Sequence, residues 1–529
     1  MGHCIDYIRE KRLKYKQILI IEPFNNVFME LLKKRDIASL LNMKNLSVTL
    51  FKDPHEIIPQ IIGMTISSRK VNVLYHLSYR SIYQDLFQEI ARVFSSEKMA
   101  LETTVRTLDI LLYEWTQNQL KSIQKQYPRV SFTNKLFKDM PAVIISAGPS
   151  LEKRIDEIKE IQDRALIIAP GSGAKVCSNS GIKAHVALAI DSSILVADIL
   201  RNSKLDILLG SNRLHPEVYS VFPNKIYKFT LSNELIAKYY QKYSGLPSDD
   251  DISDYSSVSC AAVDLAVKMG CNPIILVGQD LCYYDNREHA GEEENSLAEE
   301  RKAAWIEAQD INGNAVYTDD LFLTMRRDIE VLALRNMATI INASEAGLGI
   351  PGVENQKFRD VITQYIDKKQ VDISESLAQT LNQIDNDSDK TDNVSEFFHD
   401  LILEIEKIEK INSEKLEELR RLNSSLEKGF KDNRLASNLL SIEEKNKELL
   451  SNDLYREVIQ VSVERFLLIY FAGSLYNAKS EQDPRAKLFY ESKVYELTTR
   501  YAQIIKQLTK NELDELAKTE EKGFILYND

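Results

Sequence analysis

Glycine is concentrated in one part of this 529-residue chain, and that uneven distribution constrains the fold most strongly. Thirteen of the 18 glycines lie between Gly148 and Gly352, whereas the residues after Gly352 include three glycines and a single proline, Pro484. Glycine permits tight turns and close backbone contacts, and its scarcity favours long helices. The sequence therefore predicts a central domain rich in special turns and a helical region after it.

Composition and charge exclude several classes of protein. The length allows three or four domains of roughly 100–200 residues each, and a chain that is 44% hydrophobic and 28% charged is typical of a soluble globular protein. A net charge of −12 argues against general nucleic-acid binding. The five cysteines contain no CxxC pair, so we expect neither a disulfide framework nor a zinc site, and no bound metal.

The longest apolar stretch and the N-terminal residues bear on membranes and export. Phe466 to Tyr476 is too short to span a bilayer, and the first 21 residues lack the apolar core of a secretory signal. We therefore expect a cytoplasmic protein with no membrane insertion.

Three domains are expected from the order of the apolar patterns. Strand-like runs at 16–23, 47–51 and 72–77 alternate with helical stretches, which predicts a small N-terminal α/β domain over 1–115, with a helical connector to about 140. After a polar segment, apolar residues recur at helical spacing from Phe398 to Leu426 and again in 436–475 and 485–518. This pattern predicts a C-terminal helical bundle within 370–529.

The central domain, 141–356, has the pattern of a parallel sheet. Near-continuous apolar runs at 142–147, 165–171, 185–191, 205–212 and 272–280 alternate with helical segments. Such strands are buried on both faces, so we expect a Rossmann-like, doubly wound α/β sheet with its binding site at the carboxyl ends of the strands.

Small and polar residues follow these strands and are the first site candidates. They comprise the turn Gly148-Pro149-Ser150 and the strand ends Gly171-Ser172, Asp191, Asn212 and Gln279-Asp280. A Gly-Pro-Ser turn that opens a helix can bind a phosphate, although Ser150 could instead only cap that helix. Each aspartate could likewise be a helix cap, so the prediction depends on several strands ending in this way.

Further candidates lie downstream. Tyr283 can bond a phosphate, and the acidic segment of about 20 residues after it is typical of a mobile lid. His289 has the only side chain in that run whose ordinary pKa lies near neutrality. Thr318 and Asp319 precede a helix expected from Leu321, and Glu345, in a glycine-rich loop, could contact sugar hydroxyls.

The segments AVIISAGPSL, ALIIAPGSG, HVALAIDSS, GQDLCYYDNREH and INASEAGLGIPG, in this order, resemble the central domain of the motility accessory factors (Maf), which are bacterial flagellin glycosyltransferases. The segments are more distantly similar to bacterial sialyltransferases that use a CMP-activated sugar. A related domain also occurs in archaeal 6-hydroxymethylpterin diphosphokinases. The AGPSL turn and the GQDLCYYDNREH block carry most of the likeness.

The resemblance implies a CMP site lined by Gly148, Pro149, Ser150, Gly171, Ser172, Asp191 and Asn212. It aligns Ser256, Ser257 and Ser259 with a Ser-Gly pair of the sialyltransferases, whose glycine is missing here, and it places Tyr283 and His289 in the phosphate-binding and lid region. The sialyltransferase histidine would fall near Phe322 or Leu323, where this chain has none. The general base is therefore unassigned, with His289, Asp319 and Asp191 as candidates in that order.

The implied function is inverting transfer of a nonulosonic acid (pseudaminic, legionaminic or sialic) from its CMP ester to Ser/Thr of flagellin, in support of flagellar assembly and motility. The partners would be flagellin and the CMP-sugar, and no cofactor or divalent ion is obligatory. Two alternatives stay open: a 6-hydroxymethylpterin diphosphokinase, with Asp191 and Asp280 as Mg²⁺ ligands, and a non-enzymatic flagellin chaperone. Whether the chain forms a homo-oligomer is also open.

Overall fold

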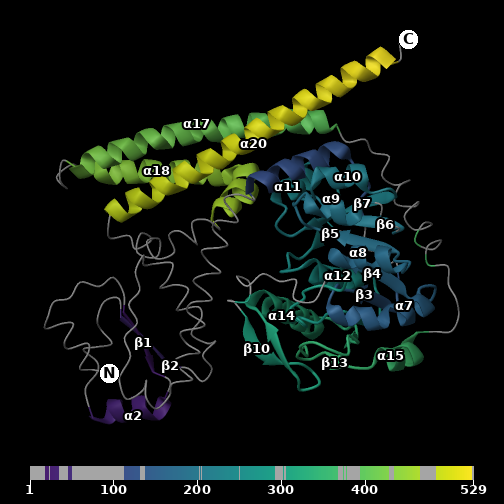
Figure 1. Cartoon of the computed structure of the whole chain (residues 1–529). Helices are drawn as coiled ribbons and strands as arrows, with labels where there is room; N and C mark the ends of the chain where they lie inside the picture. Colours follow the sequence, from purple (N-terminus) through teal and green to yellow (C-terminus); the bar gives the residue numbers. More distant parts are fainter. Residues whose placement is uncertain are drawn as a thin grey trace. The chain divides into compact units, whose positions relative to one another are not determined.

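The computed structural model describes residues 18–22, 24–34, 46–50, 112–130, 137–201, 203, 205–248, 251–291, 302, 305–366, 373, 377, 393–427, 434–464 and 484–526. The chain separates into two compact units, one comprising 1–110 with 406–503 and the other 111–405 with 504–529 (Figure 1). In the described part of the chain, none of the helices combines the length and the apolar composition needed to cross a lipid bilayer.

Residues near the N-terminus form the start of an α/β arrangement. Strand β1 (Ile18–Glu22) pairs in parallel with β2 (Leu46–Leu50), and helix α2 (Asn25–Lys34) lies between them in sequence. Two of the predicted strands are thereby confirmed, whereas the third, at 72–77, lies outside the described residues. Ile20 and Phe28 belong to one small apolar cluster between strand and helix.

Long helices dominate the C-terminal region, as its low glycine content predicts. They are α17 (Val394–Glu427), α18 (Arg434–Ser451) and α20 (Pro484–Leu526), with a short π-helical turn at Tyr455–Ile459. Leu419 and Leu422 of α17 pack against Ile442 of α18. A buried ion pair joins the helices as well, because Lys415 Nζ lies 2.8 Å from Glu491 Oε2.

The central part contains the sheet that positions the site. Within the described residues, nine parallel strands lie in the order β13-β12-β9-β3-β4-β5-β6-β7-β8. Their bounds are β3 (Ala142–Ile145), β4 (Leu166–Pro170), β5 (Val186–Ala189), β6 (Ile207–Ser211), β7 (Lys225–Leu231), β8 (Asp251–Ile252), β9 (Ile274–Val277), β12 (Ile340–Asn342) and β13 (Glu354–Asn355). The predicted Rossmann-like α/β fold is confirmed.

Alternate residues of the central strands face two separate apolar cores. Val143 and Ile145 of β3 pack on one face, whereas Ala142 and Ile144 pack on the other. The first face is covered by α7 (Ile155–Ile161), α8 (Ser172–Ser180), α9 (Leu195–Leu200), α10 (Pro216–Val221) and α15 (Phe358–Tyr365). The second is covered by α12 (Val258–Lys268) and α14 (Asp320–Arg335), so the sheet is doubly wound (Figure 1).

The strand order reverses between β3 and β9. After β3 the chain adds β4 to β8 in succession on one side, and α12 then crosses to β9 on the other side of β3. In open α/β sheets, the loops leaving two such strands diverge and create the usual ligand crevice at their carboxyl ends. The segments that follow β3 and β9 are therefore the place to look for a site.

Candidate functional site

The turn after β3 and the segment after β9 are bonded directly to each other. The Ser150 amide donates a hydrogen bond of 2.8 Å to Asp280 Oδ2, and Ser150 Oγ donates to Asp280 Oδ1. Ser146 Oγ donates to Gln279 Oε1 over 2.6 Å, and the Gly148 amide donates to the Gly278 carbonyl over 2.8 Å. Four hydrogen bonds between protein groups thus join the two segments.

Asp280 is the buried charge at this junction. Its side chain is only 2% exposed, and burial raises the pKa of its carboxyl to about 6, although the two hydrogen bonds from Ser150 oppose that rise. Both of its oxygens are occupied by Ser150. Asp280 therefore helps to hold the turn after β3 in place.

Gly148 and Ser150 both pack against the segment after β9. A Cβ atom on Gly148 would lie 2.5 Å from the Gly278 carbonyl oxygen and 2.6 Å from the Asp280 carboxyl carbon. The close approach that needs glycine here is to the neighbouring strand end, whereas the sequence suggested a ligand. Pro149 begins a six-residue 3₁₀ helix, η2 (Pro149–Arg154). The amide of its second residue, Ser150, donates to Asp280.

The start of α8, one strand away, has no side-chain cap. Gly171 adopts a φ of +51° and precedes the helix without a side-chain cap, and a Cβ atom on Gly173 would lie 2.0 Å from the Ile145 carbonyl oxygen. Glycines thus bring this helix start against the end of β3. Among the described residues, the amides of Ser172 and Gly173 donate no hydrogen bond, so they are available to an anion.

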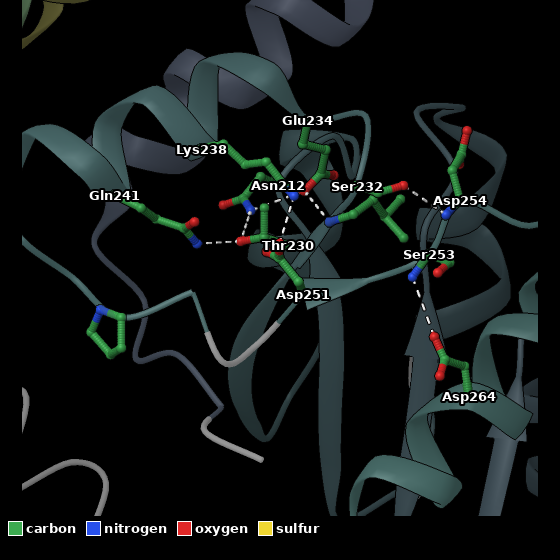
Figure 2. A network of polar contacts seen from close by, with 12 residues as sticks. Asn212, Thr230, Ser232, Glu234, Lys238, Gln241, Asp251, Ser253, Asp254 and Asp264 are labelled. Carbon is green, nitrogen blue, oxygen red and sulfur yellow. Dashed lines mark hydrogen bonds and ion pairs between the residues drawn. The ribbon is translucent and has the colours of Figure 1, made fainter. Parts of the chain in front are cut away.

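Asp191 and Asn212 follow the next two strands. Asp191 is exposed, and its Oδ1 accepts a hydrogen bond of 3.0 Å from the Ser193 amide in its own loop. Asn212 is buried, and Figure 2 shows its amide beside Thr230 and Glu234. Its Nδ2 donates to Glu234 Oε2 over 3.0 Å and its Oδ1 accepts from Ser122 Oγ over 3.1 Å, so its polar atoms serve the protein interior.

Glu234 is the centre of that network. Its Oε1 accepts from the Arg213 amide over 2.8 Å, and its Oε2 accepts from the Leu231 amide over 2.9 Å. Burial raises the pKa of the Glu234 carboxyl, while the charge of Arg213 and these hydrogen bonds lower it. The network joins the ends of β6 and β7 and is invisible to motif reasoning, because no pattern in the sequence pairs Asn212 with Glu234.

Arg213 lies just beyond the end of β6 and was not among the residues predicted from the sequence. Its guanidinium lies 4.6 Å from the centroid of the Trp115 ring, Nε donates to the Ile190 carbonyl over 3.0 Å, and an ion pair of 3.0 Å joins it to Asp254. The indole N–H of Trp115 donates to Ser192 Oγ over 3.2 Å. The connecting helix at 112–125 is thereby tied to the ends of β5 and β6, a contact between residues almost 100 positions apart.

The three serines at 256–259 each have a protein partner. Ser257 Oγ accepts from the Cys260 amide over 3.2 Å and caps α12. Ser256 donates to Asp328 Oδ2 from its amide over 2.9 Å and from its hydroxyl over 2.6 Å. The Ser259 hydroxyl lies 3.1 Å from Ser146 Oγ and donates to it, because the Ser146 proton is already given to Gln279 Oε1. Of the three serines, Ser259 is therefore the one that contacts the turn after β3.

Tyr283, Thr318 and Asp319 lie together beyond β9. The Tyr283 hydroxyl donates to Asp319 Oδ2 over 2.7 Å, and Thr318 Oγ1 donates to the Leu281 carbonyl over 2.8 Å. Asp319 Oδ1 accepts from the Phe322 amide over 2.9 Å, so Asp319 is the N-cap of α14. Capping is a common role for an aspartate immediately before a helix. Both oxygens of Asp319 are therefore engaged.

The segment that contains His289 is attached to the turn after β3. The Ala290 amide donates to the Ala147 carbonyl over 2.7 Å, and Glu152 Oε1 accepts from Arg287 over 3.1 Å and from the Gly291 amide over 2.8 Å. His289 is 39% exposed in its side chain. The remainder of the predicted lid, 292–301, lies outside the described residues.

Glu345 stabilises a helix start. It has a φ of +58°, its Oε1 accepts from the Phe358 amide over 2.8 Å, and it pairs with Arg154 over 3.1 Å. Within the described ranges, no group of three or more His, Cys, Asp or Glu side chains is arranged to hold a metal ion.

Comparisons with known proteins agree with this fold. Residues 116–286 match the family model of 6-hydroxymethylpterin diphosphokinase MptE-like proteins. A solved structure of a Maf glycosyltransferase from Magnetospirillum magneticum AMB-1 is similar with a TM-score of 0.51 and 17% sequence identity, covering 94% of this chain and 76% of that chain. No curated protein matches. The likeness to Maf proteins expected from the sequence is thus confirmed at the level of the fold.

Proposed function

We propose that this protein is a cytoplasmic glycosyltransferase that moves a nonulosonic acid from its CMP ester to Ser/Thr hydroxyls of flagellin. The proposal is supported by the fold shared with a Maf glycosyltransferase over 94% of the chain. The observation that carries it is the uncapped start of α8 beside the switch point between β3 and β9, where a nucleotide phosphate would be bound.

The donor phosphate is proposed to lie on the Ser172 and Gly173 amides. Departure of CMP from a tertiary anomeric carbon leaves oxocarbenium character on the sugar and negative charge on the phosphate. Amide dipoles at a helix start stabilise that charge and need no metal ion for it. Ser150, the other expected phosphate ligand, is already bonded to Asp280.

A general base must accept the proton of the acceptor hydroxyl. Both oxygens of Asp319 have donors, and Asp191 Oδ1 accepts from its own loop. His289 lies on the segment that is attached to the turn after β3, so it is our first choice of base. Helices α17, α18 and α20 are the proposed surface for the protein acceptor, because amphipathic helices pair readily with other helices.

Binding measurements with two variants at one residue test the phosphate position. Ser172→Pro removes the amide proton at the first helical position, where proline is well tolerated, and Gly171 before it has no Cβ to clash with the ring. Ser172→Ala removes only the hydroxyl. We expect CMP affinity to fall about tenfold in Ser172→Pro and by less than about threefold in Ser172→Ala. Unchanged affinity in Ser172→Pro would refute this phosphate position.

The family-model match keeps a pterin diphosphokinase as a second candidate. That reaction uses Mg²⁺, and Asp191 with Asp280 was the expected ligand pair. These residues follow β5 and β9, which are three strands apart and therefore about 14 Å apart in the sheet. That separation of the two strands disfavours one ion with ligands at about 2 Å from both residues. Mg²⁺-dependent binding of ATP in preference to CMP would nevertheless favour this candidate.

A non-enzymatic flagellin chaperone is the remaining alternative. It would bind flagellin through its helical region and would bind neither CMP nor a CMP-sugar. Calorimetry with flagellin, CMP and ATP on the same preparation separates the three functions.

A further inference from the structure

Three aromatic rings beyond β9, those of Tyr283, Trp305 and Tyr317, are stacked in succession, and the tilted ring of Phe322 adjoins them; we call these four rings the aromatic stack. The Tyr283 and Trp305 rings lie 5.0 Å apart at 22°, and the Trp305 and Tyr317 rings lie 5.0 Å apart at 24°. Phe322 lies 5.0 Å from Tyr283 at the inner end. The rings come from three separate segments, so the fold assembles them.

The inner end of the stack is held rigidly. Tyr283 is buried, its hydroxyl is bonded to Asp319, and its amide donates to the Tyr317 carbonyl over 2.8 Å. Thr318 is bonded to Leu281 on the same segment. Tyr283 follows Asp280 by three residues, and Asp280 is bonded to the turn after β3. The aromatic stack therefore begins close in sequence to the switch point between β3 and β9.

The outer end is exposed and belongs to a small hairpin. Strands β10 (Ile306–Gln309) and β11 (Ala315–Thr318) pair antiparallel, with Glu307 directly opposite Tyr317. Tyr317 is 42% exposed, and Glu307 is exposed on the same face of the hairpin, because directly opposed residues share a face. The outer ring thus presents a flat apolar surface on the same face of the hairpin as an exposed acidic residue.

Opposite charges lie at the two ends of this surface. Lys302 Nζ lies 5.8 Å from the centroid of the Trp305 ring, and Glu307 pairs with Tyr317. The surface therefore has an ammonium beside the Trp305 ring, the exposed Tyr317 ring next to Trp305, and the acidic residue Glu307 opposite Tyr317 in the hairpin register. An acidic sugar matches that order, because its carboxylate is attracted to Lys302, its C–H face can cover an aromatic ring, and its hydroxyls can donate to Glu307.

We propose that Tyr317, Trp305, Lys302 and Glu307 form a subsite for the sugar ring of the donor, with the ring stacked on Tyr317. This inference rests on the proposed function and deepens it, because it assigns the sugar half of the donor to the hairpin and leaves the nucleotide half at the start of α8. It also gives the β10–β11 hairpin a role in choosing the sugar.

The test compares two probes, CMP and CMP-N-acetylneuraminic acid, by calorimetry on the full-length chain. Tyr317→Ala should weaken binding of the CMP-sugar about tenfold and leave CMP binding unchanged, because only the sugar contacts the ring. Tyr317→Phe retains the ring and should stay within about twofold of the unmodified protein. Tyr113→Ala, a substitution at another exposed tyrosine on the 112–125 helix, is the matched control and should change neither affinity.

Equal CMP-sugar affinity in Tyr317→Ala and the unmodified protein would overturn the subsite and leave the proposed function standing. An equal loss for CMP and the CMP-sugar would also overturn it, since the defect would then not concern the sugar. If the unmodified protein binds neither probe, the proposed function fails and the subsite fails with it. Near-ultraviolet circular dichroism of each variant checks that the aromatic stack itself is intact.

Discussion

Replacing Ser150 by alanine removes one of the two donors that hold the Asp280 carboxylate. The Ser150 amide would remain bonded to Oδ2 over 2.8 Å, whereas Oδ1 would lose its donor in a place that is 2% exposed to water. A buried acceptor without a partner is costly, and it is more costly when it is charged.

The pKa of Asp280 sets how the effect depends on pH. Burial raises this pKa from 3.8 to about 6, which corresponds to about 3 kcal/mol of penalty against the ionised form. Because the folded pKa exceeds the unfolded one, stability from this group is complete below pH 3.8 and declines as pH rises through 6. A hydrogen bond to the carboxylate contributes about 1.5–3 kcal/mol, against about 0.5–1.5 kcal/mol for the protonated acid.

We therefore expect Ser150→Ala to lose about 2 kcal/mol of unfolding free energy at pH 8 and about 1 kcal/mol at pH 5. Urea unfolding at both pH values measures the two losses. Ser178→Ala is the control, because the Ser178 hydroxyl is buried without a hydrogen-bond partner among the described residues, so its removal should cost no stability at either pH. A loss that is the same at pH 5 and pH 8, or no loss at all, would refute the reasoning about Asp280.

Three other substitutions test neighbouring parts of the account by the same unfolding assay. Gly148→Ala should cost about 1–3 kcal/mol, because its Cβ would meet Gly278 and Asp280 atoms at 2.5–2.7 Å, whereas Gly349→Ala, whose nearest neighbour lies at 3.4 Å, should be close to neutral; equal effects would contradict the close packing. Asn212→Ala should cost about 2 kcal/mol, since it removes a donor to the buried carboxylate of Glu234, and a neutral result would mean that the network contributes little. Burial raises the pKa of Glu512, which is 1% exposed, to about 7, so stability declines as pH rises from 4.5 through 7. Glu512→Gln should therefore gain about 2 kcal/mol more at pH 8 than at pH 5, and a gain independent of pH would contradict the assignment.

The sheet could be predicted because its strands are continuous apolar runs between helical segments. Strands β3, β4, β5, β6 and β9 lie within the predicted runs. Strand β7 was missed because its segment, KIYKFTL, has a lysine at the centre. In the structure Lys228 is buried, with its ammonium bonded to the Ser122 carbonyl and 5.2 Å from the Tyr127 ring. A charged residue in a buried strand cannot be recognised without its partners.

The sequence shows that small and polar residues follow the strands. Which of these residues contact one another depends on the order of the strands in the sheet. Only the adjacency of β3 and β9 pairs Ser150 with Asp280, and no spacing in the sequence reveals it. Arg213 and Trp115 are likewise joined only by the fold. The cap at Asp319 was visible from sequence, because capping is a local interaction.

The most direct test of the central claim is the intact mass of flagellin after incubation with this protein and a CMP-nonulosonic acid. The account predicts a mass increase by one or more sugar-acid residues, absent without the CMP-sugar and reduced in Ser172→Pro relative to Ser172→Ala. Unchanged flagellin mass with every CMP-nonulosonic acid tested, together with turnover of ATP on a hydroxymethylpterin, would contradict it.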